Sequence, residues 1–237
     1  WLGPAETRPY NTTYCPTGWR WWWDFGLGGL GDIGCHTLDI PIYALQLGYP
    51  DKVYLDDSLD YGRDAIGKGR VHQDAATYVY EFPALGGRPG VKVFWYEGGR
   101  LPNLPGITTE EMLTNSLEGG CLLVGDKNTI FSPGMRPTSP RFVNDWNELR
   151  RELPPKTLPR AVGGPIAEVI AAIQGKIEAP GSNFDYAVPL TEIVILGTIA
   201  NRARKTVEYN PWDMSFKDPS LNSYIKEPMR PGWEYGG

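Results

Sequence analysis

Cysteine is scarce in this chain, and long apolar runs are missing from it. Three cysteines, Cys15, Cys35 and Cys121, stand among 237 residues. Their number is odd and no two form a C-x-x-C pair, so the sequence implies neither a disulfide framework nor a zinc cluster. We expect buried or incidental thiols, because free cysteine behaves as a small hydrophobe. No uninterrupted apolar run approaches the roughly 18 residues of a membrane span, so none is predicted.

Positive charge is also in short supply. The chain has 23 Lys and Arg against 28 Asp and Glu, a net charge of −5 and a pI near 5.2. This balance argues against nucleic acid or an anionic membrane as a partner. The chain starts at Trp1 without Met or a charged leader, which is typical of a piece cut from a longer chain; an export signal would lie upstream of Trp1. The cytoplasm and the periplasm both stay open.

Glycine, proline and tryptophan are abundant, with 29, 22 and 9 residues. Glycine and proline at this level predict many turns and long ordered loops. The tryptophans offer flat apolar faces, useful in a core or for stacking on sugar rings. Residues 1–24 form an aromatic, proline-rich entry that contains Trp19-Arg20-Trp21-Trp22-Trp23. This cluster has two interpretations: a hydrophobic clamp on the core, or a partly exposed wall near a site with Arg20 oriented by stacking.

The most informative stretch runs from Phe25 to Asp39. Glycines lead into an expected helix over residues 30–47, in which Pro41 predicts a kink or break and Gly48 a C-cap. Asp32, His36 and Asp39 are spaced to share one helical face, which Tyr43 continues. Two carboxylates and an imidazole at a glycine-rich entry suggest chemistry. The alternative is a helix start with a satisfied core histidine and capping carboxylates.

The glycines also fit the dinucleotide fingerprint G-x-G-x-x-G through Gly26, Gly28 and Gly31. That fingerprint needs a buried β-branched strand before it and continuing β-α-β alternation after it. Residues 19–25 are not such a strand, and no alternation follows. We therefore do not expect this loop to bind a dinucleotide.

Downstream, the pattern changes to period two, which predicts strands joined by turns and hence an antiparallel sheet. The expected strands are Lys52–Leu55, Thr77–Phe82, Val91–Tyr96, Cys121–Val124 and Thr129–Phe131, with turns at Pro83–Gly90 and Gly125–Asn128. The expected helices are Asp145–Leu153, Ile166–Ile173 and Pro189–Arg202, and a helical turn is expected near Thr109–Leu117 in the long loop 98–118. Residues 210–237 are expected to be an irregular tail.

Three further groups have competing interpretations. His72 is expected to be a surface or sheet histidine. Asp32, His36 and Asp39 could hold a transition metal, but the entry supplies no further ligand, and we predict no metal. The segment around Asn183, Asp185 and Tyr186 is either a polar loop that reaches a substrate or a capped loop before the Pro189 helix.

The chain resembles the C-terminal, substrate-side domain of the Gfo/Idh/MocA family of NAD(P)-dependent oxidoreductases. The resemblance covers nearly the whole chain. It rests on the segments Trp1–Ala5, Arg8–Asn11, Trp19–Gly26, Gly29–His36 with Asp39, Phe82–Ala84, Trp95–Gly99, Val124–Lys127, Gly181–Ala187, Pro189–Glu192 and Pro231–Glu234.

The resemblance implies roles for individual residues. His36 would take the hydroxyl proton of an alcohol while hydride passes to the nicotinamide, and Asp32 would orient the ring or bind a neighbouring hydroxyl. Arg20, Trp22, Asp39, Asn183, Asp185 and Tyr186 are candidate substrate contacts. NAD or NADP would be bound mainly by a Rossmann domain absent from this sequence, with Gly28 and Gly29 at most adjacent to it. The family's Glu-Lys-Pro motif and its lysine are absent too, so we expect the isolated chain to be inactive.

We therefore predict one α+β domain over residues 1–237, with an open, mainly antiparallel sheet and helices packed on one face. Its expected function is oxidation or reduction of a sugar, cyclitol or related polyol. The resemblance implies that the open sheet face forms a homo-oligomer interface. Two alternatives stay open: an NAD-assisted glycoside hydrolase domain, and a non-catalytic module that binds a ligand or partner.

Overall fold

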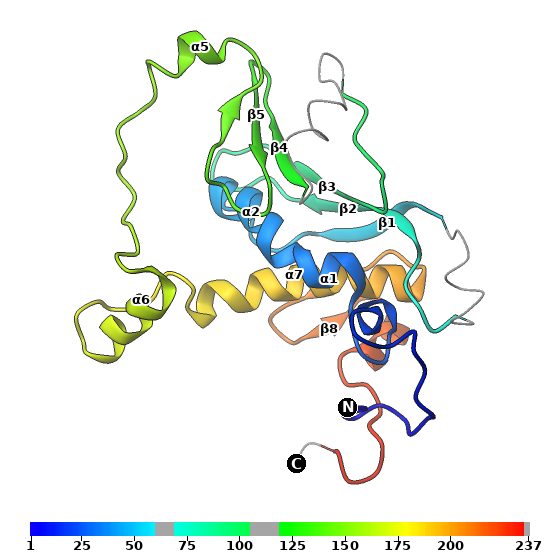
Figure 1. The fold of residues 1–237 in the computed structure, drawn as a ribbon. Coiled ribbons are helices and arrows are strands. Elements are labelled where there is room, and N and C mark those ends of the chain that lie inside the picture. The colour runs from blue at the N-terminus through cyan, green and yellow to red at the C-terminus, as the bar shows by residue number, and fades with distance from the viewer. Residues whose placement is uncertain (60–68, 105–118, 235–237) are drawn as a thin grey trace.

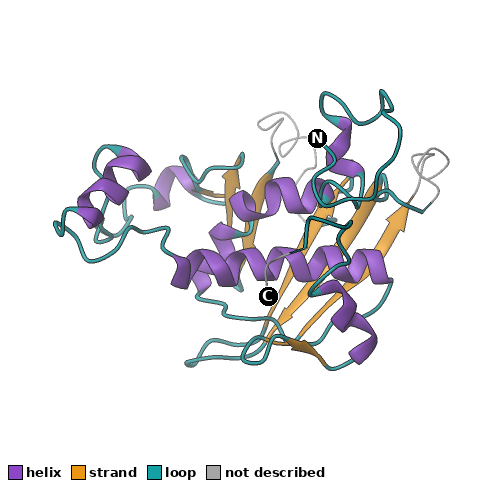
Figure 2. Cartoon of the chain, turned by 90° about the horizontal axis from the view of Figure 1, so that it is seen from below, coloured by secondary structure: helices purple, strands orange, loops and turns teal. Residues whose placement is uncertain are grey.

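The computed structural model describes residues 1–59, 69–104 and 119–234. In these ranges it shows the predicted α+β architecture, with antiparallel open sheets and helices against one face (Figures 1 and 2). No helix in these three ranges is long and apolar enough to cross a membrane.

The glycine-rich stretch forms two helices rather than the single helix expected over residues 30–47. After a 3₁₀ turn at Gly18–Trp21, α1 spans Gly28–Thr37 and α2 spans Asp39–Leu45. The break fits Pro41, because a proline ring clashes with the carbonyl four residues earlier, which is that of Thr37. The left-handed cap of α2 is Gln46, with φ 47°, so the expected cap at Gly48 was two residues too late.

The central sheet is antiparallel, in the order β1-β2-β3. Its strands are β1 (Lys52–Leu59), β2 (Ala75–Phe82) and β3 (Val91–Glu97), each at least one residue longer than expected. Alternate side chains of β2 and β3 point toward the helices, as period two requires. They pack with α1 and with α7 (Phe184–Ala203), which cross the same face of the sheet (Figure 2). The largest fully buried core side chains include Leu30, Leu47, Tyr78, Tyr80 and Ile193.

The predicted hairpin is confirmed as β4 (Gly120–Val124) and β5 (Thr129–Pro133), closed by a hydrogen bond from the Gly125 amide to the Asn128 carbonyl at 3.0 Å. A two-residue strand, β6 (Arg141–Phe142), pairs with β5 and was not predicted. The turn at Pro83–Gly90 is also confirmed, by reciprocal backbone bonds between Leu85 and Arg88. The helical turn expected near Thr109–Leu117 lies outside the described residues.

Two short helices lie on an arm that leaves the body of the chain (Figure 1). They are α5 (Trp146–Leu149), less than half as long as expected, and α6 (Gly164–Ile173). The arm returns to α7, which starts at Phe184 and not at Pro189. The Asn183 side chain caps it, accepting the Tyr186 amide at 3.2 Å. Pro189 therefore lies inside α7, where it removes one backbone hydrogen bond. Burial of the helical turns after Pro189 stabilises α7 by more than this lost bond costs.

The C-terminal tail is more regular than expected. Val207 exchanges two backbone bonds with Val53 and so covers the free edge of β1. A hairpin of β7 (Tyr209–Asn210) and β8 (Ser215–Phe216) follows, and then a 3₁₀ helix at Pro219–Tyr224. Such cover on a sheet edge prevents unwanted strand pairing.

Alkaline pH should weaken this tail. Glu192 of α7 accepts the hydroxyls of Tyr49 and Tyr209. Burial, and then Glu192, raise the pKa of Tyr209 to about 12, above the value of about 10 for a free tyrosine. This contribution to stability is therefore complete below pH 10 and is lost as the pH rises from 10 toward 12. The thermal unfolding midpoint should fall as the pH is raised from 8 to 11, and it should fall less steeply in Tyr209→Phe than in the native chain. Parallel curves for the two proteins would show that Tyr209 is not the group responsible.

Candidate functional site

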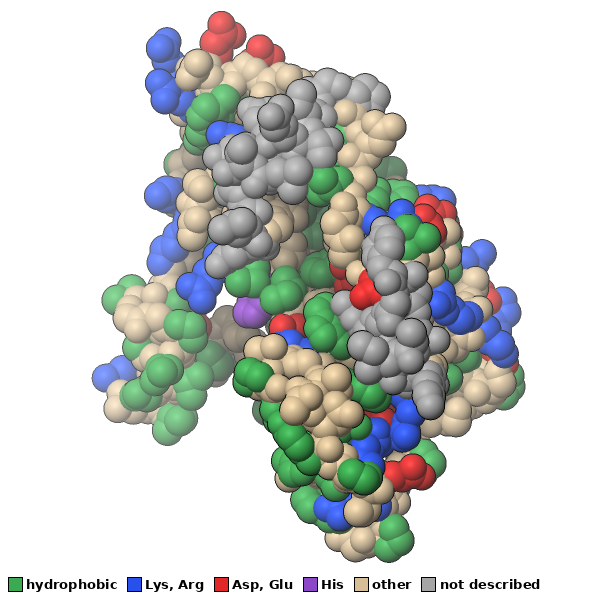
Figure 3. Space-filling view, turned by 45° about the vertical axis from the view of Figure 1, so that its right-hand side comes forward, with side chains coloured by type: hydrophobic (Ala, Val, Ile, Leu, Met, Phe, Trp, Pro, Cys, Tyr) green, Lys and Arg blue, Asp and Glu red, His purple; other side chains and the backbone are tan. Residues whose placement is uncertain are grey.

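Helix α1 presents Asp32 and His36 on its exposed side. They stand one helical turn apart, so their side chains are neighbours. Of the two histidines in the chain, His36 is exposed and His72 is buried. The space-filling view shows one imidazole at the surface, among apolar side chains and close to acidic ones (Figure 3). The alternative of a satisfied core histidine is therefore wrong for His36.

Arg20 joins this pair from the preceding 3₁₀ turn. Its Nε donates to Asp32 Oδ2 at 3.0 Å, with both side chains partly exposed. Its guanidinium lies over the Trp19 ring, 4.7 Å from the centroid, as the aromatic cluster suggested. A carboxylate offers two acceptor oxygens, and the pair with Arg20 uses Oδ2 of Asp32. Arg20, Asp32 and His36 thus form a polar row along one surface.

Trp22 does not line that row. Its ring is 9% exposed and packs edge-on against Tyr14, with ring centroids 4.8 Å apart. Its backbone bridges to Val71, and Phe25 packs on the same cluster. The packing of Trp22 against Tyr14 and Phe25 favours the clamp interpretation for this residue.

Asp39, the first residue of α2, belongs to a second polar group, which it forms with the start of α7. It accepts the Tyr186 hydroxyl, and Tyr186 packs edge-on against Tyr43, with centroids 5.9 Å apart. Burial, and then the Asp39 carboxylate, raise the pKa of the Tyr186 hydroxyl, so it remains a donor. Asn183 caps α7 beside Tyr186, and Asp185 is exposed in the first turn of that helix. Asp185 and Tyr186 are thus in the helix and Asn183 is its extended N-cap, so the expected loop ends at Asn183 and the capped alternative fits it better.

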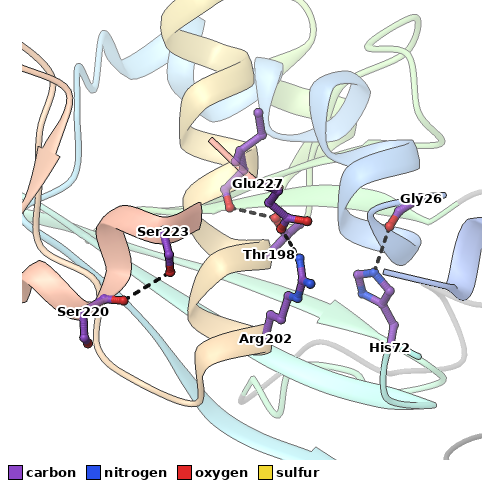
Figure 4. Close-up of polar contacts among 8 residues, drawn as sticks. Gly26, His72, Thr198, Arg202, Ser220, Ser223 and Glu227 are labelled. Atoms are coloured by element: carbon purple, nitrogen blue, oxygen red, sulfur yellow. Dashed lines mark hydrogen bonds and ion pairs between the residues drawn. The ribbon is translucent and has the colours of Figure 1, made fainter. Parts of the chain in front are cut away.

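His72 packs against the glycine-rich stretch. The sequence predicted a surface or sheet histidine; the surface position is wrong, and His72 directly follows Val71, which forms a β-bridge with Trp22. The side chain is 1% exposed, and Nε2 lies 3.2 Å from the Gly26 carbonyl (Figure 4). Its ring stacks on Trp23 at 3.4 Å between centroids, and Arg202 approaches the Trp23 ring to 5.6 Å. His72 therefore supports the entry to α1 from below.

Gly28 shows why this entry is rich in glycine. Its φ is +68°, and a Cβ built there would lie 2.5 Å from His72 Nδ1. Gly28→Ala should therefore destabilise the protein by about 2 kcal/mol, through backbone strain and a clash. Chemical denaturation would measure this loss. Gly48→Ala is a matched control, since Gly48 has φ +70° but open space around it. An equal loss of stability in the two variants would show that backbone strain alone, and not the clash with His72, is the cause.

Gly29 is close to a residue to which we assigned no role, Glu97. A Cβ at Gly29 would lie 2.8 Å from Glu97 Oε2. Glu97 also accepts hydrogen bonds from the Tyr78 hydroxyl at 3.0 Å and from Trp95 Nε1 at 3.1 Å. The segment Trp95–Gly99 had been singled out in the sequence, but nothing local indicated that its carboxylate reaches α1. Gly28 and Gly29 thus direct their missing side chains into the protein, as packing surfaces.

No metal centre is formed by the residues that the structure describes, where no three His, Cys, Asp or Glu side chains gather as ligands. Within the same ranges, Asp32 is paired with Arg20, and Asp39 with Tyr186.

One family model matches part of the chain. Residues 1–79 match the family model for the C-terminal alpha/beta domain of an oxidoreductase family, Gfo/Idh/MocA. This match covers the first third of the chain, and that part is similar to the C-terminal domain of the Gfo/Idh/MocA oxidoreductases. The matched segment contains Arg20, Asp32, His36, Asp39 and His72. No curated protein matches the chain.

Proposed function

We propose that this chain is a Gfo/Idh/MocA domain that supplies the proton-transfer histidine and substrate contacts for oxidation or reduction of a sugar, cyclitol or related polyol. The observation that carries the proposal is the exposed His36 one turn from an ion-paired Asp32. In the oxidation direction, His36 takes the hydroxyl proton as the carbon–oxygen double bond forms. NAD or NADP, when bound, would be the hydride acceptor.

The surrounding residues suit a substrate with several hydroxyl groups. Asp32 offers carboxylate oxygens as acceptors, and Arg20 offers guanidinium donors beside it. Asp39 and Tyr186 form a second polar pair, with Asn183 and Asp185 at the start of the same helix. We propose that the row along α1 holds the reacting hydroxyl and that the second pair binds a more distant one.

The chain's own glycines do not fit a dinucleotide cradle, because Gly28 and Gly29 face His72 and Glu97. The proposal therefore assigns NAD or NADP to a Rossmann half. We further propose that copies associate through the sheet face opposite the helices. Phe94 on that face is 46% exposed and stacks on Tyr96, with centroids 6.2 Å apart. Exposed aromatic side chains in a patch favour such an interface.

The test is to supply the chain with a Rossmann half, by fusion or co-expression, and to assay NAD(H) and NADP(H) turnover on a panel of sugars and cyclitols. Net reduction of the cofactor with at least one polyol is expected. Release of free sugar from a glycoside without net NADH would indicate the hydrolase instead. Ligand binding without turnover by a well-folded fusion would indicate a non-catalytic module.

A further inference from the structure

The first turn of α1 is not capped by its own sequence. The N-cap residue, Leu27, makes no side-chain hydrogen bond to the helix, and the first turn contains no acidic residue. The first amide groups of any helix lack partners within it and carry partial positive charge. An acceptor from another element would therefore stabilise this end of α1 and fix its position.

Glu97, at the end of β3, brings a carboxylate next to this turn. Its Oε1 accepts the Tyr78 hydroxyl at 3.0 Å, and its Oε2 accepts Trp95 Nε1 at 3.1 Å. The same Oε2 would lie 2.8 Å from a Cβ on Gly29, in the first turn of α1. The carboxylate thus lies beside the first turn of α1, and glycine at position 29 leaves room for it.

The carboxylate is held from the interior of the protein. Asn201 of α7, which is fully buried, donates from Nδ2 to the Tyr78 hydroxyl at 2.6 Å. Beside Glu97, Gly98 has φ +70°, and a Cβ there would lie 2.1 Å from the Asp74 carbonyl oxygen. The end of β3 is therefore tightly packed against β2. A chain of contacts runs from α7 through Tyr78 and Glu97 to the start of α1.

We propose that Glu97 is a positioning residue for the proton transfer assigned to His36. It acts through α1, which carries Asp32 and His36 on the side exposed to substrate. The inference rests on the proposed function, because positioning has meaning only if His36 reacts. Small misplacements of a reacting group can lower the rate strongly while the protein stays folded.

The first experiment tests the contact without any assay of activity. Gly29→Ala places a methyl group against the carboxylate, so it should lower the unfolding temperature of the native chain. In the Glu97→Ala background the obstacle is gone, and the higher helix propensity of alanine should make Gly29→Ala neutral or stabilising. Equal effects in the two backgrounds would show that Glu97 does not hold α1, and the proposal would fail.

The second experiment measures kcat, KM and the pH profile of the Rossmann-supplied protein. Glu97→Gln should lower kcat about tenfold, change KM less than twofold, and shift the pH limb that disappears in His36→Gln. Glu208→Gln is the matched control. Glu208 lies in the C-terminal segment between Val207 and β7, where it pairs with Lys217 at 3.1 Å. Its replacement should leave kcat and the pH profile unchanged.

Glu97→Gln with native kcat and pH profile per folded molecule would overturn the positioning role, whatever its unfolding temperature. If no variant and no parent turns over any polyol, the proposed function fails and the positioning role falls with it. The stability cycle would then still show whether Glu97 holds the start of α1. The two failures are thus distinguished.

Discussion

Replacing His36 by alanine should lower kcat for polyol oxidation by about 10²–10⁴-fold, the range in which a general base contributes. In the proposed function the imidazole takes the hydroxyl proton, and it lies exposed on α1 beside Asp32. The loss should appear mainly in kcat, because the Arg20–Asp32 pair that would bind a neighbouring hydroxyl remains. Steady-state kinetics of the Rossmann-supplied protein would measure it.

The control for this prediction is Lys127→Ala, an exposed change in the turn between β4 and β5. It should leave kcat and KM as they are. His36→Ala should also keep the unfolding temperature within a few degrees, since an exposed side chain contributes little to the core. Near-native activity in His36→Ala would show that His36 is not the general base and that another residue takes the proton.

Local features were the part of the fold that the sequence predicted well. The turn Gly125–Asn128 defined its hairpin, and the alternation in Val91–Tyr96 gave the strand and its faces. Pro41 indicated a break, although its ring acts on the carbonyl of Thr37 and so ends α1 before the proline itself. The start of α7 was missed because Pro189 resembled a first-turn proline. Long-range burial decides that boundary, and no local pattern reports it.

In the candidate site, too, the sequence predicted local features well and long-range contacts poorly. The spacing of Asp32 and His36 gave their common helical face, and Arg20 beside Trp19 suggested the stacking that the structure shows. His72 and Glu97 were missed as partners of the glycines, because each reaches Gly28 or Gly29 from more than 40 residues away in the sequence. A glycine-rich entry indicates close approach, but the sequence alone does not say what approaches.

A glycine outside that entry sets the packing of the whole core. Gly197 lies in the middle of α7, where a Cβ would be 2.1 Å from the Tyr80 hydroxyl and 2.5 Å from Leu30 Cδ2. Gly197→Ala should therefore lower the free energy of unfolding by about 3 kcal/mol, because overpacking outweighs the better helix propensity of alanine. Urea denaturation followed by circular dichroism would measure the loss.

Tyr80 provides the test of that cause. Its hydroxyl is buried without a hydrogen-bond partner in the part of the chain that the structure describes. Tyr80→Phe should be neutral or slightly stabilising, since it removes an unsatisfied polar group. It should also recover part of the stability lost in Gly197→Ala, because one of the two clashes disappears. Strictly additive effects of the two substitutions on stability would show that the clash is not with Tyr80.

Tyr78→Phe is the matched control, two residues away on the same face. It loses its bonds to Asn201 and Glu97, and it should destabilise the protein by about 1–3 kcal/mol without rescuing Gly197→Ala.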